Sequence, residues 1–356
     1  MALVAIALVV LFGMTELLAR GYRAARNERA ESHARRGQGL REKGRYRDAA
    51  GEYRAALTFS PRNEEYRLAL ALSLLAVKDR REAERHLVEL RQVNPASGMV
   101  NLLLARIDNL EDRTDAAEAG YHRAIYGYWP EDPQGNRLKA RFELVALYDR
   151  TGERQKLLSE LLQAAAEAPP EPDLKNRIGH LLLGYGAPQQ AADVFRESAK
   201  LDDTDPEAWT GLGEAERAMG SYRSAMSAFR AALRRAPRDP LATRLLAETS
   251  EVMGLDPAGA RLSGAERRRR SRELLARVLV SLESCDALPA EAREEVEEAR
   301  KAVAAPRPPR GQDDTPELLE LAEVLWQARA ASCGGRPQSD RVLGLVMARV
   351  QADDRP

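Results

Sequence analysis

A small residue followed four positions later by a larger apolar one recurs along the middle of the chain. The first position is held by Ala49, Ala83, Ala117, Leu157, Ala191 and Ala225. The second is held by Tyr53, Leu87, Tyr121, Leu161, Phe195 and Phe229. Steps are 34 residues, except for one of 40 between Ala117 and Leu157. A self-similar period of this length is typical of stacked helical hairpins, so the pattern predicts six helix-turn-helix units.

Turn-forming residues mark the end of each predicted unit. They are Pro61, Pro95, Pro130, Pro169 and Pro237, with Asp203 at the matching place of the fifth unit. Proline cannot continue a helix, because it lacks a backbone donor. A single helix over Leu241–Met253 matches the first half of a seventh unit, so we expect the array and its capping helix to cover residues 30–254.

A G-x-G sequence at Gly211 and Gly213 has two interpretations. A dinucleotide-binding loop would follow a strand and place a third glycine at position 216, where the chain has Glu216. The register instead places both glycines where two helices approach closely.

Composition agrees with an all-α fold, because only 5% of residues are aromatic while 44% are apolar and 31% charged.

The units resemble tetratricopeptide repeats, of the kind found in membrane-anchored bacterial proteins. The sixth unit carries the pattern at Trp209, Leu212, Gly213, Gly220, Tyr222, Ala225, Phe229, Ala232, Leu233 and Pro237. The first unit repeats it at Gly37, Gly44, Tyr46, Ala49, Tyr53, Ala56, Leu57 and Pro61. The resemblance implies a right-handed helical-hairpin solenoid whose concave face binds peptides or partner helices.

The register also predicts which side chains face the concave surface. An apolar floor is expected from Leu68, Leu72, Leu75, Met99, Leu102 and Phe142, continued by polar Arg106, Asn109, Lys139, Asp149, Asn176 and His180. The alternative, that several of these leucines pack between adjacent helices, stays open. Ala34 and Gln38 stand where some relatives clamp a terminal carboxylate, so we do not expect a chaperone-tail adaptor.

Three aromatic residues, Tyr126, Tyr128 and Trp129, precede a six-residue insertion after the third unit. They form a candidate patch for a partner, because exposed aromatic rings often anchor interfaces. The alternative, which we favour, is that the rings fill a widened gap between hairpins.

The first nineteen residues predict a transmembrane anchor. Met1–Met14 is apolar throughout and Met1–Ala19 would form a helix about 28 Å long, close to the hydrocarbon thickness. A signal peptide is disfavoured because a basic start and a small-x-small cleavage site are missing, and we expect the true start to lie upstream. A buried N-terminal helix is disfavoured because the run is apolar on all sides instead of on one stripe. Residues 20–29 form a basic flank that favours a cytoplasmic body.

Residues 255–356 predict a separate helical module. Ser263 and Glu266 form a capping-box pattern before the first helix, a second follows Pro289, a third begins at Thr315, and a last covers about Asp340–Gln351. Residues 305–314 form a Pro-rich linker. We interpret the basic run Arg267–Arg270 as a solvated helix face, and expect no nucleic-acid partner, because the net charge is zero.

The two cysteines fall at ends of the first and third helices of this module. In an up-and-down arrangement these ends meet, so a disulfide between Cys285 and Cys333 is reasonable if their Cα atoms lie within about 7 Å. The bond would persist only in an oxidising compartment, which favours a periplasmic body against the basic flank. Two unlinked thiols remain the alternative.

Motifs for catalysis, metals, cofactors or a small-molecule substrate are missing from the sequence. Its four histidines stand singly, and it has neither a phosphate loop nor a nucleophile elbow. We therefore predict a membrane-anchored scaffold that is no enzyme and recruits a protein or peptide through its concave face. The alternatives are an envelope assembly or regulatory factor acting through the C-terminal module and, more remotely, an enzyme in that module.

Overall fold

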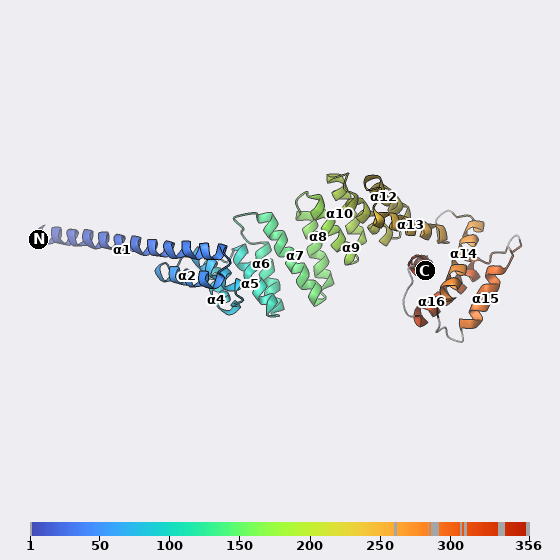
Figure 1. The fold of residues 1–356 in the computed structure, drawn as a ribbon, viewed down its shortest axis with the longest axis horizontal. Helices are drawn as coiled ribbons and strands as arrows, with labels where there is room; N and C mark the ends of the chain where they lie inside the picture. The colour runs from blue at the N-terminus through green and yellow to red at the C-terminus, as the bar shows by residue number, and fades with distance from the viewer. Residues whose placement is uncertain are drawn as a thin grey trace. The chain divides into compact units, whose positions relative to one another are not determined.

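The computed structural model describes residues 2–259, 262–283, 285, 292–306, 308–309, 312–333 and 339–353, with side chains for all of these except 2–11, 339, 352 and 353. The ordered elements among these residues are helices (Figure 1), and Ser97 and Tyr128 add an isolated parallel β-bridge. The predicted all-α class is thus confirmed. The chain divides into two compact units, Met1–Ala168 and Pro169–Pro356, which are described separately.

The first unit consists of consecutive helical hairpins. Its helices are α1 (Ala2–Glu42), α2 (Tyr46–Phe59), α3 (Glu64–Ala76), α4 (Arg80–Val93), α5 (Gly98–Leu110), α6 (Thr114–Ile125), α7 (Pro133–Thr151) and α8 (Arg154–Glu167). Each helix packs against the next one in the chain.

The repeating small and large positions form the core of these hairpins, as the register predicts. All six members of the first set and all six of the second are at most 4% exposed. Burial of this size supplies the main favourable free energy of a solenoid, in which each hairpin contacts only its neighbours.

The step of 40 residues is taken up mainly by one helix. The first helices of the neighbouring hairpins, such as α5, have 13 residues, whereas α7 has 19. The insertion therefore lengthens α7 by six residues and leaves the packing positions of its hairpin, such as Leu157 and Leu161, buried.

Helix α1 is much longer than a repeat helix and runs on alone beyond α2 (Figure 1). Near the end of α2, Arg26 donates to the Phe59 carbonyl oxygen at 2.7 Å, and the His33 ring stacks on Phe59 with centroids 5.7 Å apart. The helix leaves the first hairpin as its direct continuation, with no linker between them.

The N-terminal part of α1 carries exposed apolar side chains. Phe12, Met14, Leu17 and Leu18 are 57–73% exposed. In the described part of the chain, no helix combines the length and apolarity needed to cross a membrane. Of the predicted anchor, Met1 and the side chains of residues 2–11 lie outside the described residues.

The second unit continues with hairpins and ends in a four-helix group. Its helices are α9 (Pro172–Gly184), α10 (Pro188–Leu201), α11 (Pro206–Ala218), α12 (Tyr222–Arg235), α13 (Pro240–Leu255), α14 (Gly264–Glu283), α15 (Ala292–Ala304), α16 (Thr315–Ser332) and α17 (Ser339–Asp353). Part of the predicted linker (307, 310 and 311) and the predicted start of the second module helix (286–291) lie outside the described residues.

Local sequence sets where the repeat helices of this unit begin. Asp205 accepts hydrogen bonds from the backbone amides of Glu207 and Ala208, and Asp239 does the same at the start of α13. Each aspartate is followed by a proline at the first helical position, where a missing N–H costs nothing.

The C-terminal helices pack against the last helices of the array. The sequence predicted a separate module instead. Tyr222, Val252 and Leu255 of the last repeat helices share one buried core with side chains of α14–α17, such as Val346. Arg349 of α17 also donates to the Gly220 carbonyl oxygen at 2.8 Å and pairs with buried Asp256 at 2.9 Å. The four helices therefore cap the array, a role that the sequence assigned to α13 alone.

The G-x-G sequence is a packing feature. A Cβ at position 211 would clash with the ring of Phe195 in the preceding hairpin, and one at 213 with the ring of Phe229 in the same hairpin. The two glycines thus admit one aromatic ring each.

Candidate partner-binding site

A cleft of about 490 Å³ lies between the first helices of the first two hairpins, and we call it the α1–α3 cleft. Helix α1 lines it with Glu31, Ala34, Arg35, Gln38 and Arg41, and the Tyr53 ring of α2 contributes to its wall. Helix α3 lines it with Glu65, Tyr66, Leu68, Ala69 and Leu72. Its size lies within the range of clefts that bind ligands.

The floor of the cleft is apolar and partly supported by the core. Leu68 and Leu72 are half-buried and pack against the buried cluster that contains Leu87 and Leu104. Ala34 and Ala69 are small, so they leave room above the floor. Such a floor suits apolar side chains of a bound segment.

Charge differs between the two ends of the cleft. Glu31 and Glu65 stand at the N-terminal ends of the lining stretches of α1 and α3, whereas Arg41 stands ten residues after Glu31, about 15 Å along the helix. Within the described residues, neither these carboxylates nor the guanidiniums of Arg35 and Arg41 are in ion pairs. They remain available to opposite charges of a partner.

The pKa shifts of two tyrosines indicate which charges lie at each end of the cleft. Burial raises the pKa of Tyr66, and the nearby Glu31 and Glu65 carboxylates raise it further. Burial also raises the pKa of Tyr53, while the positive charge of Arg41 opposes the shift. Glu31, Glu65 and Arg35 therefore lie near Tyr66, and Arg41 and Glu42 lie near Tyr53.

The structure brings two of the predicted groove residues, Leu68 and Leu72, into this cleft. Leu75 is half-buried and packs on the core beside them. Each of these three leucines packs against the core and keeps part of its surface exposed. The groove-facing and the helix-packing interpretations are therefore both correct for them.

Two predicted polar groove residues connect helices instead of facing a partner freely. Arg106 of α5 forms a two-pronged ion pair with Glu143 of α7, at 2.8 and 2.6 Å. Asn109 accepts a hydrogen bond from Arg150 at 2.5 Å. A partner that used these groups would first have to break their internal contacts.

Burial corrects two further predictions. Leu102 is only 2% exposed, so it belongs to the core and cannot contact a partner. Asn176, in the second unit, is 1% exposed and donates to the Asp205 carboxylate at 2.6 Å. Packing of adjacent hairpins covers both positions, although the register turns them inward.

The remaining predicted groove residues lie outside the cleft. Met99, Lys139 and Asp149 are exposed and Phe142 is half-buried in the first unit. His180 is exposed in the second unit, 3.2 Å from Glu207 and edge-on to the Phe195 ring.

Several cleft residues were missed by the sequence analysis, above all Glu31, Arg35, Arg41 and Tyr66. Applying the concave register to the first unit finds Glu31 and Arg41, because they occupy the places that Glu65 and Leu75 hold in the second unit. The predicted groove residues begin only in the second unit, at Leu68.

The predicted aromatic patch is divided by the structure. Trp129 is buried, packs on Gly98 and donates to the Ala124 carbonyl oxygen at 2.8 Å, so it fills the gap between hairpins. Tyr126 and Tyr128 are 68% and 66% exposed. Of the three rings, only Trp129 therefore fills the gap between hairpins, as the favoured interpretation predicted.

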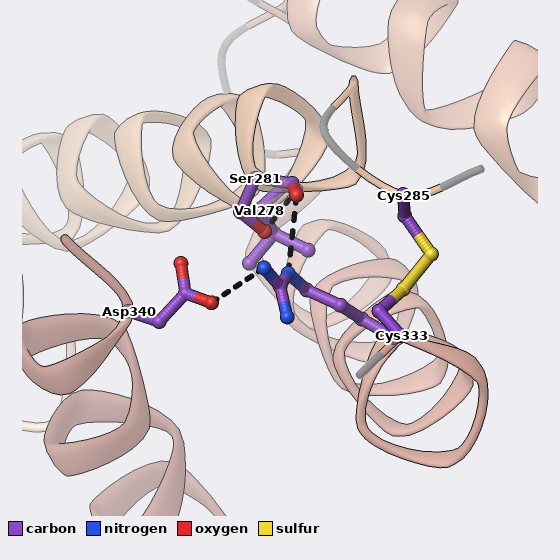
Figure 2. Close-up of a disulfide and its surroundings, with 6 residues drawn as sticks. Val278, Ser281, Cys285, Cys333 and Asp340 are labelled. Carbon is purple, nitrogen blue, oxygen red and sulfur yellow. Dashed lines mark hydrogen bonds and ion pairs between the residues drawn. A yellow bond between two sulfur atoms is a disulfide. The ribbon is translucent and has the colours of Figure 1, made fainter. Parts of the chain in front are cut away.

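The structure joins Cys285 and Cys333 by a disulfide, with their Cα atoms 5.5 Å apart (Figure 2). Beside it, the buried Arg329 donates to the Ser281 carbonyl oxygen at 3.1 Å and pairs with the buried Asp340 at 2.6 Å. The bond and the ion pair together hold the ends of α14, α16 and α17.

The arginine run at the start of α14 is largely paired with acidic residues. Arg268 binds Asp314 at 2.6 and 2.7 Å, while Arg269 and Arg270 both bind Glu266. These two hydrogen bonds lower the pKa of Glu266 to about 2. Among the described residues there is no group of three metal-ligating side chains.

Comparisons with known proteins agree with the repeat architecture. Residues 182–249 match the tetratricopeptide repeat family model. No curated protein matches the chain. The chain is thus an all-helical repeat protein, of which residues 182–249 match the tetratricopeptide repeat.

Solved structures match part of the chain at low identity. The MamA protein is 18% identical over 59% of this chain and 93% of its own, with a TM-score of 0.31. PilW, titled a widely conserved type IV pilus biogenesis factor, is 16% identical over 62% and 99%, with a TM-score of 0.38. PilF of Pseudomonas aeruginosa is 14% identical over 63% and 99%, with a TM-score of 0.40.

Proposed function

We propose that this tetratricopeptide-type protein is a membrane-anchored scaffold that recruits a partner protein by binding one of its peptide segments in the α1–α3 cleft. The cleft itself is the observation that carries the proposal. It combines an apolar floor, side chains of both charges that form no ion pair with the described part of the chain, and a volume suited to several side chains. Proteins of this repeat type generally act as interaction scaffolds and not as enzymes, and we propose no reaction.

The exposed start of α1 supports the anchor. At 100° per residue, Phe12, Met14, Leu17 and Leu18 spread around the helix instead of forming one stripe. A protein partner would cover one face of such a helix, whereas lipid covers all of it. We therefore favour insertion of residues 1–19 into a bilayer.

The disulfide supports an extracytoplasmic body. A bond between Cys285 and Cys333 persists in an oxidising compartment and is rare in the cytoplasm. The basic flank at residues 20–29 argues for the opposite side. We favour the periplasmic side, because the disulfide indicates the compartment more directly than the flanking charges do.

Site-specific photo-crosslinking in native cells tests the recruiting role. A photoreactive residue at Leu72 should give an adduct with one discrete partner, whereas the same residue at exposed Leu162 of α8 should not. A synthetic peptide of the crosslinked partner segment is then titrated against the purified full chain. Equal adducts from both positions would contradict the proposal.

Two variants locate the binding in the cleft. Ala34→Leu fills space above the floor without removing a core contact, so it should weaken peptide binding at least tenfold while thermal unfolding is unchanged. Leu162→Glu, a control outside the cleft, should leave the affinity unchanged. Unaltered binding by Ala34→Leu would place the peptide elsewhere.

Fractionation tests the anchor. The full chain should sediment with membranes and be released by detergent but not by carbonate or high salt. A chain that remains in the soluble fraction would refute the anchor without bearing on the cleft.

A further inference from the structure

One helix carries both the proposed anchor and a wall of the cleft. Helix α1 runs without a break from Ala2 to Glu42, and Glu31, Arg35 and Arg41 lie on it. Contacts of Arg26 and His33 with Phe59 hold this helix against α2 where the first hairpin begins. The distance between bilayer and cleft is therefore set by a rigid element and not by a flexible linker.

The spacing along α1 gives the height of each end of the cleft. If the bilayer surface lies at Ala19, Glu31 stands about 18 Å and Arg41 about 33 Å from it along the helix axis. An extended chain leaving the same surface rises about 3.3 Å per residue. It reaches the acidic end after five or six residues and the basic end after about ten.

The charges of the cleft then select a direction. The acidic end, where Glu31 and Glu65 outnumber Arg35, is nearer the anchor, and the basic end, with Arg41, is farther from it. A chain that rises from the bilayer meets the carboxylates first. Complementary charges on it are basic near the bilayer and acidic farther out.

We propose that the occupant of the α1–α3 cleft is the juxtamembrane segment of another membrane protein, bound in extended form. Its basic side chain faces Glu31 and Glu65 five or six residues from the bilayer, apolar side chains lie over Leu68 and Leu72, and an acidic side chain about five residues later faces Arg41. This inference rests on the proposed anchor and cleft, and adds the origin, the charge order and the direction of the bound segment.

Lipid-anchored peptides in phosphatidylcholine vesicles that hold the full chain provide the test. The forward probe has a five-residue Gly/Ser spacer followed by Lys-Leu-Ala-Leu-Ser-Glu, with a photoreactive group replacing the second Leu. The reversed probe exchanges Lys and Glu. The forward probe should crosslink to α1 or α3 with about tenfold higher apparent affinity, because two attractive pairs replace two repulsive ones.

Charge-exchanged protein is the matched control for direction. Glu31→Lys, Glu65→Lys and Arg41→Glu together should reverse the preference between the probes, since all three side chains lie at the surface of the cleft. Equal crosslinking of both probes by the natural chain would overturn the charge order. It would leave peptide binding in the cleft, and so the proposed function, intact.

Spacer length tests the fixed height. A probe with a two-residue spacer should crosslink at least tenfold less than one with five. In Ala24→Pro, which interrupts α1 between the anchor and the first hairpin, this difference should largely disappear. Equal crosslinking with both spacers by the natural chain would overturn the rigid height. If neither probe crosslinks, and Leu72 gives no adduct in cells, the proposed function fails as well.

Discussion

The guanidinium of Arg141, in α7, donates to the Glu160 carboxylate of α8 at 2.5 Å and has no exposed surface. It also donates to both carboxylate oxygens of Glu167 at 2.9 Å. Burial alone would lower the pKa of Arg141, but its hydrogen bonds and charge pairs with these glutamates raise it. The hairpin that contains the six-residue insertion is thus held together by a buried charge network.

Removing one member of this network should be costly. Arg141→Met leaves Glu160 buried without its partner, so we expect the free energy of unfolding to fall by about 3–5 kcal/mol. Chemical denaturation of the full chain measures it. The double variant Arg141→Met/Glu160→Leu should regain much of the loss, and a loss below about 1 kcal/mol in the single variant would contradict the role assigned to Arg141.

Gly211→Ala tests the packing interpretation of the G-x-G sequence. Because the new methyl group would clash with the Phe195 ring, we expect a loss of about 1–3 kcal/mol in unfolding free energy. Gly254→Ala, on α13 with open space around it, is the matched control and should be neutral or stabilising. Equal effects of the two substitutions would show that Gly211 does not matter for packing.

Lys78 occupies a left-handed backbone conformation, with φ of 64°, at the turn where four of the other hairpins have Gly44, Gly152, Gly186 and Gly220. Lys78→Gly should therefore stabilise the first unit by about 0.5–1 kcal/mol, despite the greater entropy of glycine in the unfolded chain. Thermal unfolding measures the change. Lys78→Ala is the comparison that keeps the backbone strain, and it should bring no gain.

Tyr121 predicts a loss of stability at alkaline pH. Burial, followed by the charge of Glu143, raises its pKa to about 12. The unfolded chain loses this proton near pH 10 and the folded chain does not, so the contribution is present below pH 10 and is lost as pH rises towards 12, by about 2 kcal/mol. Tyr121→Phe should show a shallower decline over this range, and an unchanged pH profile would refute the assignment.

The disulfide should stabilise the capping helices. Its closed loop of 48 residues corresponds to about 4 kcal/mol in the entropy model. Cys285→Ser/Cys333→Ser should therefore lower the unfolding free energy of the second unit while the first unit unfolds as before. Alkylation of denatured protein from quenched cells should find no free thiol, and two reactive thiols would reject both the bond and the periplasmic body.

The repeated core could be predicted from sequence, because burial follows a fixed register. Ala49, Tyr53, Ala225 and Phe229 are buried where their spacing placed them. Leu102 shows the limit of the method. A register places a residue on one face of its helix, but the approach of the neighbouring helices decides whether that face stays open, and α5 also contacts α7.

The cap of the array could not be predicted, because it depends on contacts between distant parts of the chain. The ion pair of Arg349 with Asp256 joins residues 93 positions apart, and no periodicity links them. The same holds for the cleft charges, because whether a charged side chain finds a partner among the described residues depends on the folded surface. A truncation at Ser263 would expose Val252 and Leu255, so it would disturb the array as well as remove its cap.

The unbroken α1 also sets a direction around its own axis. Each residue of a helix turns the chain by about 100°, so one residue inserted after Arg20 would rotate the α1–α3 cleft by that angle relative to everything that precedes it. Seven inserted residues make nearly two turns and return the cleft to within about 20° of its first direction. The number of residues between the apolar run and the first hairpin therefore fixes the direction in which the cleft opens around the axis of α1.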